Sequence, residues 1–210
     1  MHFPLQLEIY SVGNIKIEIY VPDVNAVYKF YHNNKEAAYW TKVWPASIGL
    51  CRFMWQYPQF IKDKRILELA TGLGLCGLFA AHKANHVCIT DREPLAAEYV
   101  NRSAAHLQLS NVKTMALDWK EASLQPLPDV VLLSDVNYKP EVFEELQKVI
   151  EYFLNHGVTI IISTPQRLMA REFINPIRSY CVQQENFSIR MNHKETGVSV
   201  FVLIRQMVSF

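Results

Sequence analysis

Four acidic residues stand in or directly after apolar segments of this chain, and their spacing suits chemistry on a nucleoside and on a nitrogen atom. A carboxylate can hold the hydroxyl pair of a ribose, and it can also orient the N–H groups of an amine. The four residues are Glu68 in segment 65–69, Asp91 after segment 86–90, Asp118 after segment 112–117 and Asp135 after segment 129–134.

Glycines at positions 72, 74 and 77 follow the first of these segments. They are typical of a β-α-β unit that binds a nucleotide, because glycine lets the backbone pass close to a ligand where a Cβ would collide. The same spacing satisfies the Gly-x-Gly-x-x-Gly pattern of dinucleotide-binding proteins. Glu68 favours a different ligand, since a dinucleotide fold normally has an apolar core residue there. A carboxylate at this place can hold the loop's amides for a cationic ligand that resembles an amino acid.

The sequence Asp135-Val136-Asn137-Tyr138 has the parts that methylation of an amine requires. A lysine amine has an ordinary pKa of about 10.4 and must lose its proton before it attacks a methyl group. An apolar slot disfavours the charged amine, and a carboxylate orients the remaining N–H groups. An aromatic ring adds a cation-π contact to the product. We expect Asp135 and Tyr138 to provide the carboxylate and the ring, although Asp135 could instead cap the next helix beside a core tyrosine.

Alternating apolar strands and helices position these residues. We expect an α/β fold with a Rossmann-like, mostly parallel sheet of seven strands and a C-terminal antiparallel hairpin. Ligands bind at the carboxyl ends of such strands, so the residues after each strand matter most. Asp91 and Asp118 could also be simple turn or cap residues. The predicted strands are 65–69, 86–90, 112–117, 129–134 and 158–163, with a final pair near 181–191 and 198–206; the predicted helices are 74–83, 94–107, one ending before Gly157, and 166–179.

The N-terminal part, residues 1–62, is expected to cover the nucleotide site within one domain of 210 residues, with the Rossmann-like core at 63–210. Leu5, Leu7 and Ile9 alternate with polar residues, as do residues 15, 17 and 19 across Gly13-Asn14. This pattern predicts a β-hairpin with one buried face. A short helix capped by Asp23 and a second helix that starts at Pro45 follow.

The composition bounds the functional classes. Half of the residues are apolar and the formal net charge is +1 without a basic stripe, which argues against general nucleic-acid binding. The four cysteines and seven histidines have no metal-ligand spacing, so we assign no metal and expect a reducing, cytoplasmic environment. We find neither a signal peptide nor an apolar run long enough to span a membrane, and we expect a monomer.

These motifs together resemble the family 16 methyltransferases, a family of class I S-adenosylmethionine-dependent protein lysine methyltransferases with a seven-stranded sheet. The resemblance runs from about Trp40 to Phe153 and more loosely to the end. It has two departures: Ala70 replaces the usual glycine, and Asn137 replaces an apolar residue. The matching motifs are Trp40 to Pro45, Glu68-Leu69 with the glycines, Thr90-Asp91, Leu117-Asp118-Trp119, and Asp135 with Tyr138.

The resemblance implies S-adenosylmethionine as the cofactor and Asp135 with Tyr138 as the catalytic pair at the acceptor. If it holds, Asp91 takes the ribose hydroxyls and Asp118 or its neighbour meets the adenine. Ala70 would add a methyl group beside the methionine part of the cofactor, so that the loop shifts or binding weakens. The residues expected near the cofactor are Trp44, Glu68, Ala70, Thr71, Gly72, Gly74, Asp91, Arg92, Asp118, Trp119 and Ser134.

The acceptor stays open at this point. A protein lysine is the leading hypothesis, and a small-molecule N- or O-methyltransferase is the alternative. An NAD-dependent oxidoreductase would require a second domain, and a non-catalytic nucleotide-binding module is the remaining alternative. Base methylation is disfavoured because Val136-Asn137 lacks the stiffening prolines of such enzymes. Arg167 and Arg171, one turn apart, are expected on a solvated face or, less favourably, beside the substrate channel.

Overall fold

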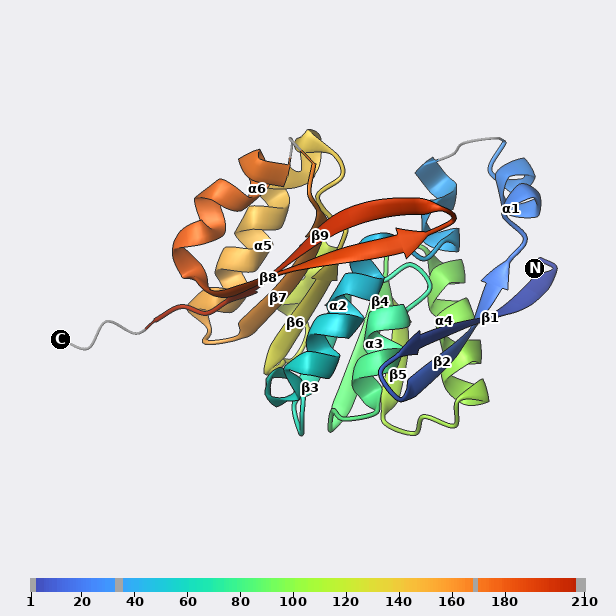
Figure 1. Cartoon of the computed structure of the whole chain (residues 1–210), viewed down its shortest axis with the longest axis horizontal. Helices are drawn as coiled ribbons and strands as arrows, with labels where there is room; N and C mark the ends of the chain where they lie inside the picture. Colours follow the sequence, from blue (N-terminus) through green and yellow to red (C-terminus); the bar gives the residue numbers. More distant parts are fainter. Residues whose placement is uncertain (1–2, 33–35, 168–169, 207–210) are drawn as a thin grey trace.

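The computed structural model describes residues 3–32, 36–167 and 170–206. Its centre is a seven-stranded sheet in the order β5-β4-β3-β6-β7-β9-β8. The first five strands in this order pair in parallel, and β9 pairs antiparallel with both β7 and β8 (Figure 1). The predicted sheet is therefore confirmed. Its strands are β3 (Arg65–Leu69), β4 (His86–Asp91), β5 (Val112–Ala116), β6 (Val130–Ser134), β7 (Thr159–Pro165), β8 (Cys181–Met191) and β9 (Lys194–Leu203).

Helices cover both faces of this sheet (Figure 1). The α-helices are α1 (Val24–Phe30), α2 (Pro45–Gln56), α3 (Leu75–Ala81), α4 (Pro94–His106), α5 (Phe143–Asn155) and α6 (Ala170–Ile177). Short 3-10 helices occur at η1 (Glu36–Thr41), η2 (Pro58–Phe60), η3 (Trp119–Leu124), η4 (Pro140–Val142) and η5 (Arg178–Tyr180). The predicted caps are confirmed: Asp23 accepts a hydrogen bond from the Ala26 amide at 2.7 Å, and Pro45 is in the first turn of α2. No helix of the described ranges is long and apolar enough to cross a membrane.

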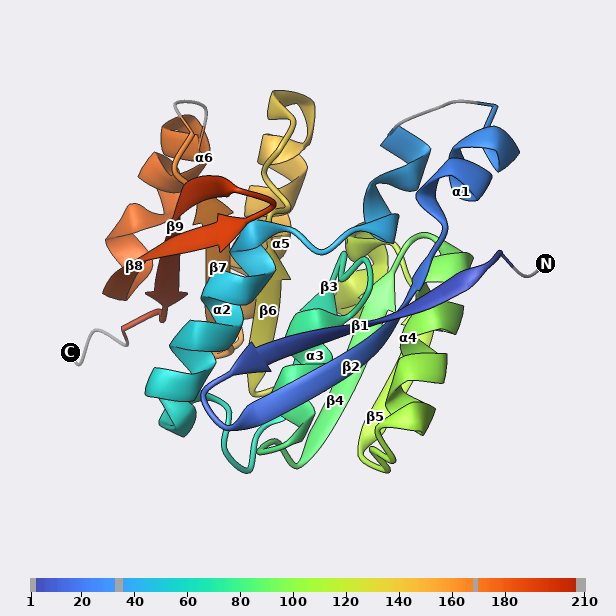
Figure 2. The ribbon, with the colours of Figure 1, turned by 45° about the vertical axis from the view of Figure 1, so that its right-hand side comes forward.

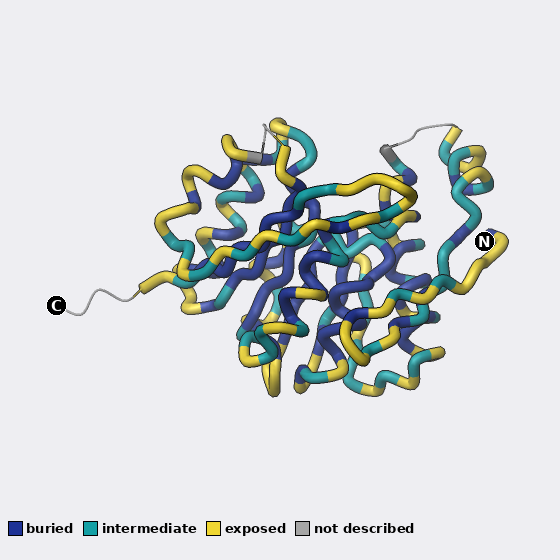
Figure 3. The backbone as a smooth tube through the Cα atoms, in the orientation of Figure 1, coloured by how far each residue is buried: buried dark blue, intermediate teal, exposed yellow. Residues whose placement is uncertain are grey.

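Alternate residues of the central strands pack into two separate cores. Ile66 and Leu132 lie in the core under α2, α3 and α4, whereas their neighbours Leu67 and Leu133 lie in the core under α5. Both faces of β3 and β6 are buried, which explains why these strands are continuous apolar runs. Figure 3 shows this buried centre, with exposed backbone concentrated at the loops and the outer hairpins.

The N-terminal hairpin, β1 (Leu5–Val12) and β2 (Ile15–Pro22), forms as predicted and buries one face, but the predicted residues of β1 are not on that face. Tyr10 pairs with Ile17, so odd residues of β1 share a face with even residues of β2. Ile17 is buried against the core, whereas Leu5, Leu7 and Ile9 are exposed on the opposite face. The two-residue turn fixes this register, and a shift of one residue would exchange the faces. The hairpin lies across α3 and α4 (Figure 2).

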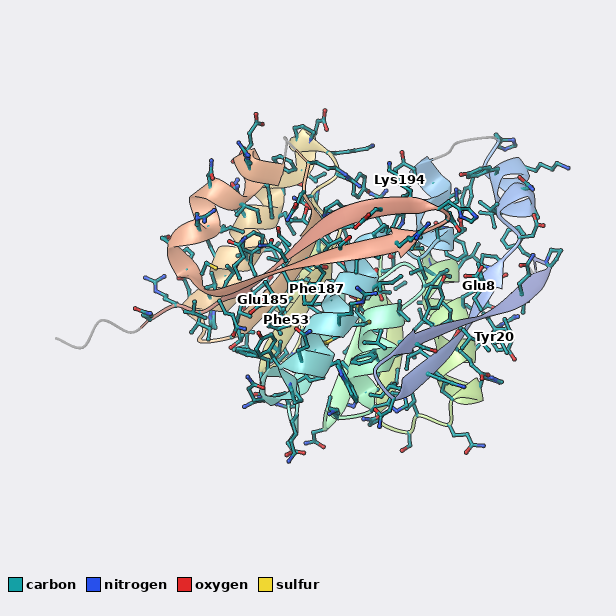
Figure 4. All side chains as sticks on the ribbon, viewed as in Figure 1. Glu8, Tyr20, Phe53, Glu185, Phe187 and Lys194 are labelled. Carbon is teal, nitrogen blue, oxygen red and sulfur yellow. The ribbon has the colours of Figure 1, made fainter. Side chains whose placement is uncertain are left out.

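The edge strand of the sheet, β8, packs against α2. Phe53 on α2 lies near Glu185 and Phe187 on β8 (Figure 4), and the Tyr57 hydroxyl donates a hydrogen bond to Glu185 Oε1 at 2.6 Å. Because α2 also packs on α3, the helix is held between the antiparallel hairpin and the glycine-rich segment. This packing fixes the start of α2, where Trp44 and Ser47 reach the carboxyl ends of the strands.

Candidate active site

A cavity of about 570 Å³ lies at the carboxyl ends of β3, β4, β5 and β6, with η1 and the start of α2 forming its other wall. Its volume is in the range that holds a cofactor-sized ligand. Of the predicted site residues, all line this cavity except Glu68 and Gly74. Residues that lie 90 positions apart in the chain, such as Trp44 and Ser134, therefore meet at one opening, because parallel strands end at the same edge of a sheet.

The loop after β3 turns sharply through residues with positive φ. Ala70 has φ of 52°, Gly72 of 60° and Gly74 of 78°. A Cβ on Gly72 would lie 3.2 Å from the Trp40 carbonyl oxygen, so glycine is required for the loop to pass under η1. Ala70 occupies a left-handed conformation that favours glycine. The departure noted in the sequence therefore coincides with a strained backbone position at the wall of the cavity.

Gly74 and Gly77 serve the packing of the chain itself, which corrects the expectation that they make room for a ligand. A Cβ on Gly74 would lie 2.8 Å from a Val100 methyl group, and one on Gly77 would lie 2.5 Å from Glu68 Oε2. Both glycines allow α3 to approach its neighbours closely. Gly74 therefore lies behind the residues that line the cavity and does not line it.

Glu68 anchors the start of α3 from inside the core. It is buried, and its Oε2 accepts a hydrogen bond from the Gly77 amide at 2.8 Å. Burial raises the pKa of Glu68 to about 7, while the hydrogen bond from the Gly77 amide opposes this rise. Glu68 is expected to hold the amides of the glycine loop, but the amide it binds is that of Gly77, in the first turn of α3. Glu68 does not reach the cavity.

Asp91 ties the end of β4 to the loop after β3. Its Oδ2 accepts from the Gly72 amide at 2.8 Å, and its Oδ1 accepts from the Glu93 amide at 3.0 Å. The cap of α4 is Glu93, whose side chain accepts from the Leu95 amide, so the cap alternative for Asp91 is wrong. Burial raises the pKa of Asp91. Its carboxylate borders the cavity and keeps unused lone pairs.

Asp118 and Trp119 line the neighbouring part of the cavity, after β5. Asp118 caps η3 by accepting a hydrogen bond from the Lys120 amide at 3.0 Å. The indole N–H of Trp119 is buried and has no hydrogen-bond partner among the described residues. An unpartnered buried donor is costly, so this N–H marks a place where a ligand acceptor would be stabilised.

Asp135 lies after β6 in a corner of the cavity, called the Asp135 corner, whose other residues are Tyr138, Tyr39 and Arg167. Its backbone is left-handed, with φ of 52°, and its amide donates to the Ser163 carbonyl at 2.9 Å. The Arg167 guanidinium donates to Oδ2 at 3.3 Å, whereas Oδ1 is buried without a partner in the described part of the chain. Burial raises the pKa of Asp135 to about 6, although Arg167 opposes this rise.

Aromatic rings flank this corner. The rings of Tyr39 and Tyr138 are edge to face with centroids 5.7 Å apart, and those of Tyr39 and Trp44 are 5.9 Å apart. The Trp44 indole N–H donates to the Tyr39 carbonyl at 3.2 Å, which connects η1 to α2. Such rings attract a cation or a methylated amine that enters between them.

Sequence reasoning missed Tyr39 and gave Arg167 only as the less favoured channel residue. Tyr39 is adjacent to the Trp40-Pro45 motif, so the aromatic cluster there was the available signal. Arg167 could be found only from the adjacency of β6 and β7. Ser134 contacts Ser47 and Ser163, with hydroxyl oxygens 3.1 Å and 3.3 Å away. Asn137 is buried with no partner for its side-chain amide within the described ranges, and it does not line the cavity.

Comparisons with known proteins agree with this geometry. A family model described as lysine methyltransferase matches residues 23–180. Protein N-lysine methyltransferase METTL21A of Danio rerio is 30% identical over 76% of this chain and 74% of its own length. Histone-arginine methyltransferase METTL23 of Xenopus laevis is 30% identical over 66% of this chain. The chain spans 58% and 63% of the METTL23 relatives from Xenopus laevis and Homo sapiens.

A solved structure shares the fold at low identity. The Pyrococcus abyssi tRNA (uracil-54, C5)-methyltransferase, in complex with S-adenosyl-L-homocysteine, matches with a TM-score of 0.61 and 13% identity. The match covers 94% of this chain and 44% of that protein. At this identity the similarity establishes the Rossmann-like methyltransferase fold and nothing further about the acceptor.

Proposed function

The chain belongs to family 16 of the class I S-adenosylmethionine-dependent methyltransferases, the lysine methyltransferase family, and from this premise we propose that it transfers a methyl group to a protein lysine. The observation that supports the acceptor role best is Asp135, a largely buried carboxylate residue that lines the cavity together with Tyr138. A carboxylate placed in this way can orient an amine by accepting one of its N–H groups.

The residues at the cavity fit the cofactor. The cavity is large enough, and the buried Trp119 indole N–H lacks a partner among the described residues. We propose that Trp44, the segment 70–72, Asp91, Arg92, Asp118, Trp119 and Ser134 hold it, with Glu68 and Gly74 supporting them from behind. When bound, S-adenosylmethionine supplies an electrophilic methyl group on a sulfonium, and its thioether is a good leaving group.

The chain's own part in the reaction is to hold a neutral amine in place and to keep water away. A lysine amine loses its proton more readily in an apolar slot than in water. Tyr39 and Tyr138 provide apolar walls, and Asp135 holds an N–H of the amine so that its lone pair is left for the methyl group. Because the pKa of Asp135 is about 6, the carboxylate is mostly ionised at neutral pH.

The corner favours an amine over a guanidinium. A guanidinium is recognised best by a carboxylate that offers both oxygens to its two parallel N–H groups. Arg167 already donates to Oδ2 of Asp135, so a guanidinium that took both oxygens would have to displace Arg167 and would meet its positive charge. The relatives include proteins named for lysine and for arginine, and this prior pairing of Asp135 with Arg167 supports lysine for the present chain.

The test is to incubate the purified protein with labelled S-adenosylmethionine and a lysate of its own host, and then to locate the label by mass spectrometry. Label on a protein lysine is expected. Label on arginine would contradict the lysine assignment, and label only in the small-molecule fraction would favour a small-molecule methyltransferase.

Asp135→Asn is expected to abolish turnover and to leave cofactor affinity, measured by calorimetry, within a few-fold of the wild type. Asp63→Asn is a matched control, because Asp63 is also left-handed, with φ of 59°, but is exposed and lies outside the cavity. Equal loss of cofactor binding and turnover in Asp135→Asn would show that the residue supports the fold.

We also propose that the protein works in a reducing compartment, such as the cytoplasm. All four cysteines are free thiols. The thiols of Cys51 and Cys76 are close enough to interact and are still unbonded. A reducing compartment maintains this state.

A further inference from the structure

We propose that Arg167 is a positioning residue for Asp135: it pairs with the carboxylate from the rim of the cavity and holds it in place, in its charged form, beside the acceptor nitrogen. This inference rests on the proposed function, because it assigns a task to a residue of the same site. It replaces the expectation that Arg167 belongs to a solvated helix face.

The sheet brings the two residues together. β6 and β7 are parallel neighbours in which Ser134 pairs with Ser163, so the segments that follow them leave the sheet side by side. The Asp135 amide donates to the Ser163 carbonyl at 2.9 Å, which fixes the segment after β6. The Gln166 amide donates to the Gly197 carbonyl at 2.9 Å, which fixes the segment after β7. Arg167 therefore extends from an anchored backbone.

The two oxygens of Asp135 have different surroundings. Arg167 donates to Oδ2 at 3.3 Å, and Oδ1 is buried with no partner among the described residues. The Asp135 side chain is 8% exposed, whereas that of Arg167 is 41% exposed. A buried carboxylate is costly without a hydrogen-bonded cation, and Arg167 supplies one from the rim of the cavity. Arg167 therefore stabilises the charged carboxylate where Asp135 borders the cavity.

Arg167 is one of several charged residues around the cavity. Lys120 is paired with Glu145 at 2.9 Å, and Asp91 accepts from two backbone amides. The remaining charged residues of the lining are Lys42, Arg92, Glu93, Asp118 and Lys139. The pKa of Asp135 responds to burial, which raises it, and to Arg167, which lowers it. Removal of Arg167 should therefore raise the pKa of Asp135, so that Asp135 stays protonated up to a higher pH.

The experiment first measures Asp135 without any turnover. The side-chain carboxyl of Asp135 is followed by carbon-13 NMR from pH 4.5 to 8.5, with its signal assigned from the Asp135→Asn variant. In Arg167→Gln we expect the titration midpoint to rise by about one pH unit, the lower end of the effect of an adjacent opposite charge, because Arg167 is partly exposed. Arg171→Gln is the matched control, since Arg171 is exposed on α6 and no ion pair of Asp135 involves it.

The second measurement is turnover with labelled S-adenosylmethionine on the protein whose lysine is labelled in the lysate experiment. In Arg167→Gln the acid limb of the kcat profile should move up with the NMR midpoint, and kcat should fall while cofactor affinity stays unchanged. Arg167→Lys should restore the midpoint, because it restores the positive charge, and should recover part of kcat.

Three results would overturn the inference: an unchanged midpoint in Arg167→Gln, an equal rise in Arg171→Gln, or a raised midpoint with an unmoved acid limb. If the midpoint rises but the wild type labels no acceptor, the pairing stands and the methyl-transfer proposal fails, so the two failures are distinguishable.

Discussion

Ala70→Gly tests the strain at the start of the cofactor loop. Ala70 has φ of 52°, a conformation that costs a residue with a Cβ about 1–2 kcal/mol relative to glycine. Glycine loses about 0.4–1 kcal/mol through its freer unfolded chain, and the partly buried methyl group contributes a further few tenths of a kcal/mol. We therefore expect the variant to be as stable as the wild type or more stable, by up to about 1 kcal/mol.

The matched control is Ala105→Gly. Ala105 is exposed on α4 in ordinary helical conformation, so glycine there is expected to cost about 0.5–1 kcal/mol. Both variants add the same unfolded-state entropy, and burial of the Ala70 methyl group differs from that of Ala105 by only a few tenths of a kcal/mol, so most of the difference reports the native backbone conformation. We expect the free energy of unfolding of Ala70→Gly to exceed that of Ala105→Gly by about 1 kcal/mol or more, which corresponds to a difference of about 2–4 °C in Tm for a chain of this size.

Stability is measured by urea unfolding and by calorimetry, and cofactor affinity by titration calorimetry. Because Ala70 lines the cavity, its replacement by glycine removes a methyl group from the cofactor's surroundings, and affinity should equal or exceed that of the wild type. If Ala70→Gly is destabilised as much as Ala105→Gly, the left-handed conformation assigned to residue 70 is wrong. If its affinity falls, the methyl group aids binding.

Two further sets of variants test Glu68 in the core and Tyr39 in the Asp135 corner. The pKa of Glu68 is 4.5 ordinarily and about 7 in the folded protein, so between these values the native state binds more protons than the unfolded state. The free energy of unfolding should therefore fall as pH rises from about 4.5 to about 7. Urea unfolding of Glu68→Gln should lack this fall, and the same dependence on pH in the variant and the wild type would contradict the prediction. Tyr39→Ala should raise KM for the lysine substrate about 3- to 10-fold through loss of an aromatic wall, with Tyr39→Phe close to the wild type; equal KM values in both variants would remove Tyr39 from the acceptor site.

The sequence was sufficient to predict the sheet, because each central strand is buried on both faces and so appears as a continuous apolar run. In the N-terminal hairpin the predicted buried face is correct for β2 and wrong for β1. Leu5, Leu7 and Ile9 alternate as a buried strand would, but the turn at Gly13-Asn14 sets a register that points them outward. Periodicity gives the spacing of side chains within one strand, and it does not give which face packs on the core.

The candidate site was predictable where it depends on strand ends and unpredictable where it depends on pairs between strands. Asp91, Asp118 and Asp135 follow strands and reach one cavity as expected. The partner of Asp135 could not be inferred, because Arg167 is brought to it by the register of β6 with β7. The glycine spacing predicts a ligand-facing Gly77, whereas the neighbours of Gly77 are Glu68 and Ile89.

Two left-handed residues at neighbouring strand ends account for the shape of the cavity. Ala70 follows β3 and Asp135 follows β6, these strands are adjacent, and both residues have φ of 52°. Each turn directs the chain away from the strand it ends, so an opening is left between the two loops. Aspartate tolerates this conformation better than alanine does. The strain is therefore concentrated at Ala70, beside the expected cofactor, while Asp135 adopts the same turn at lower cost and carries its carboxylate into the opening.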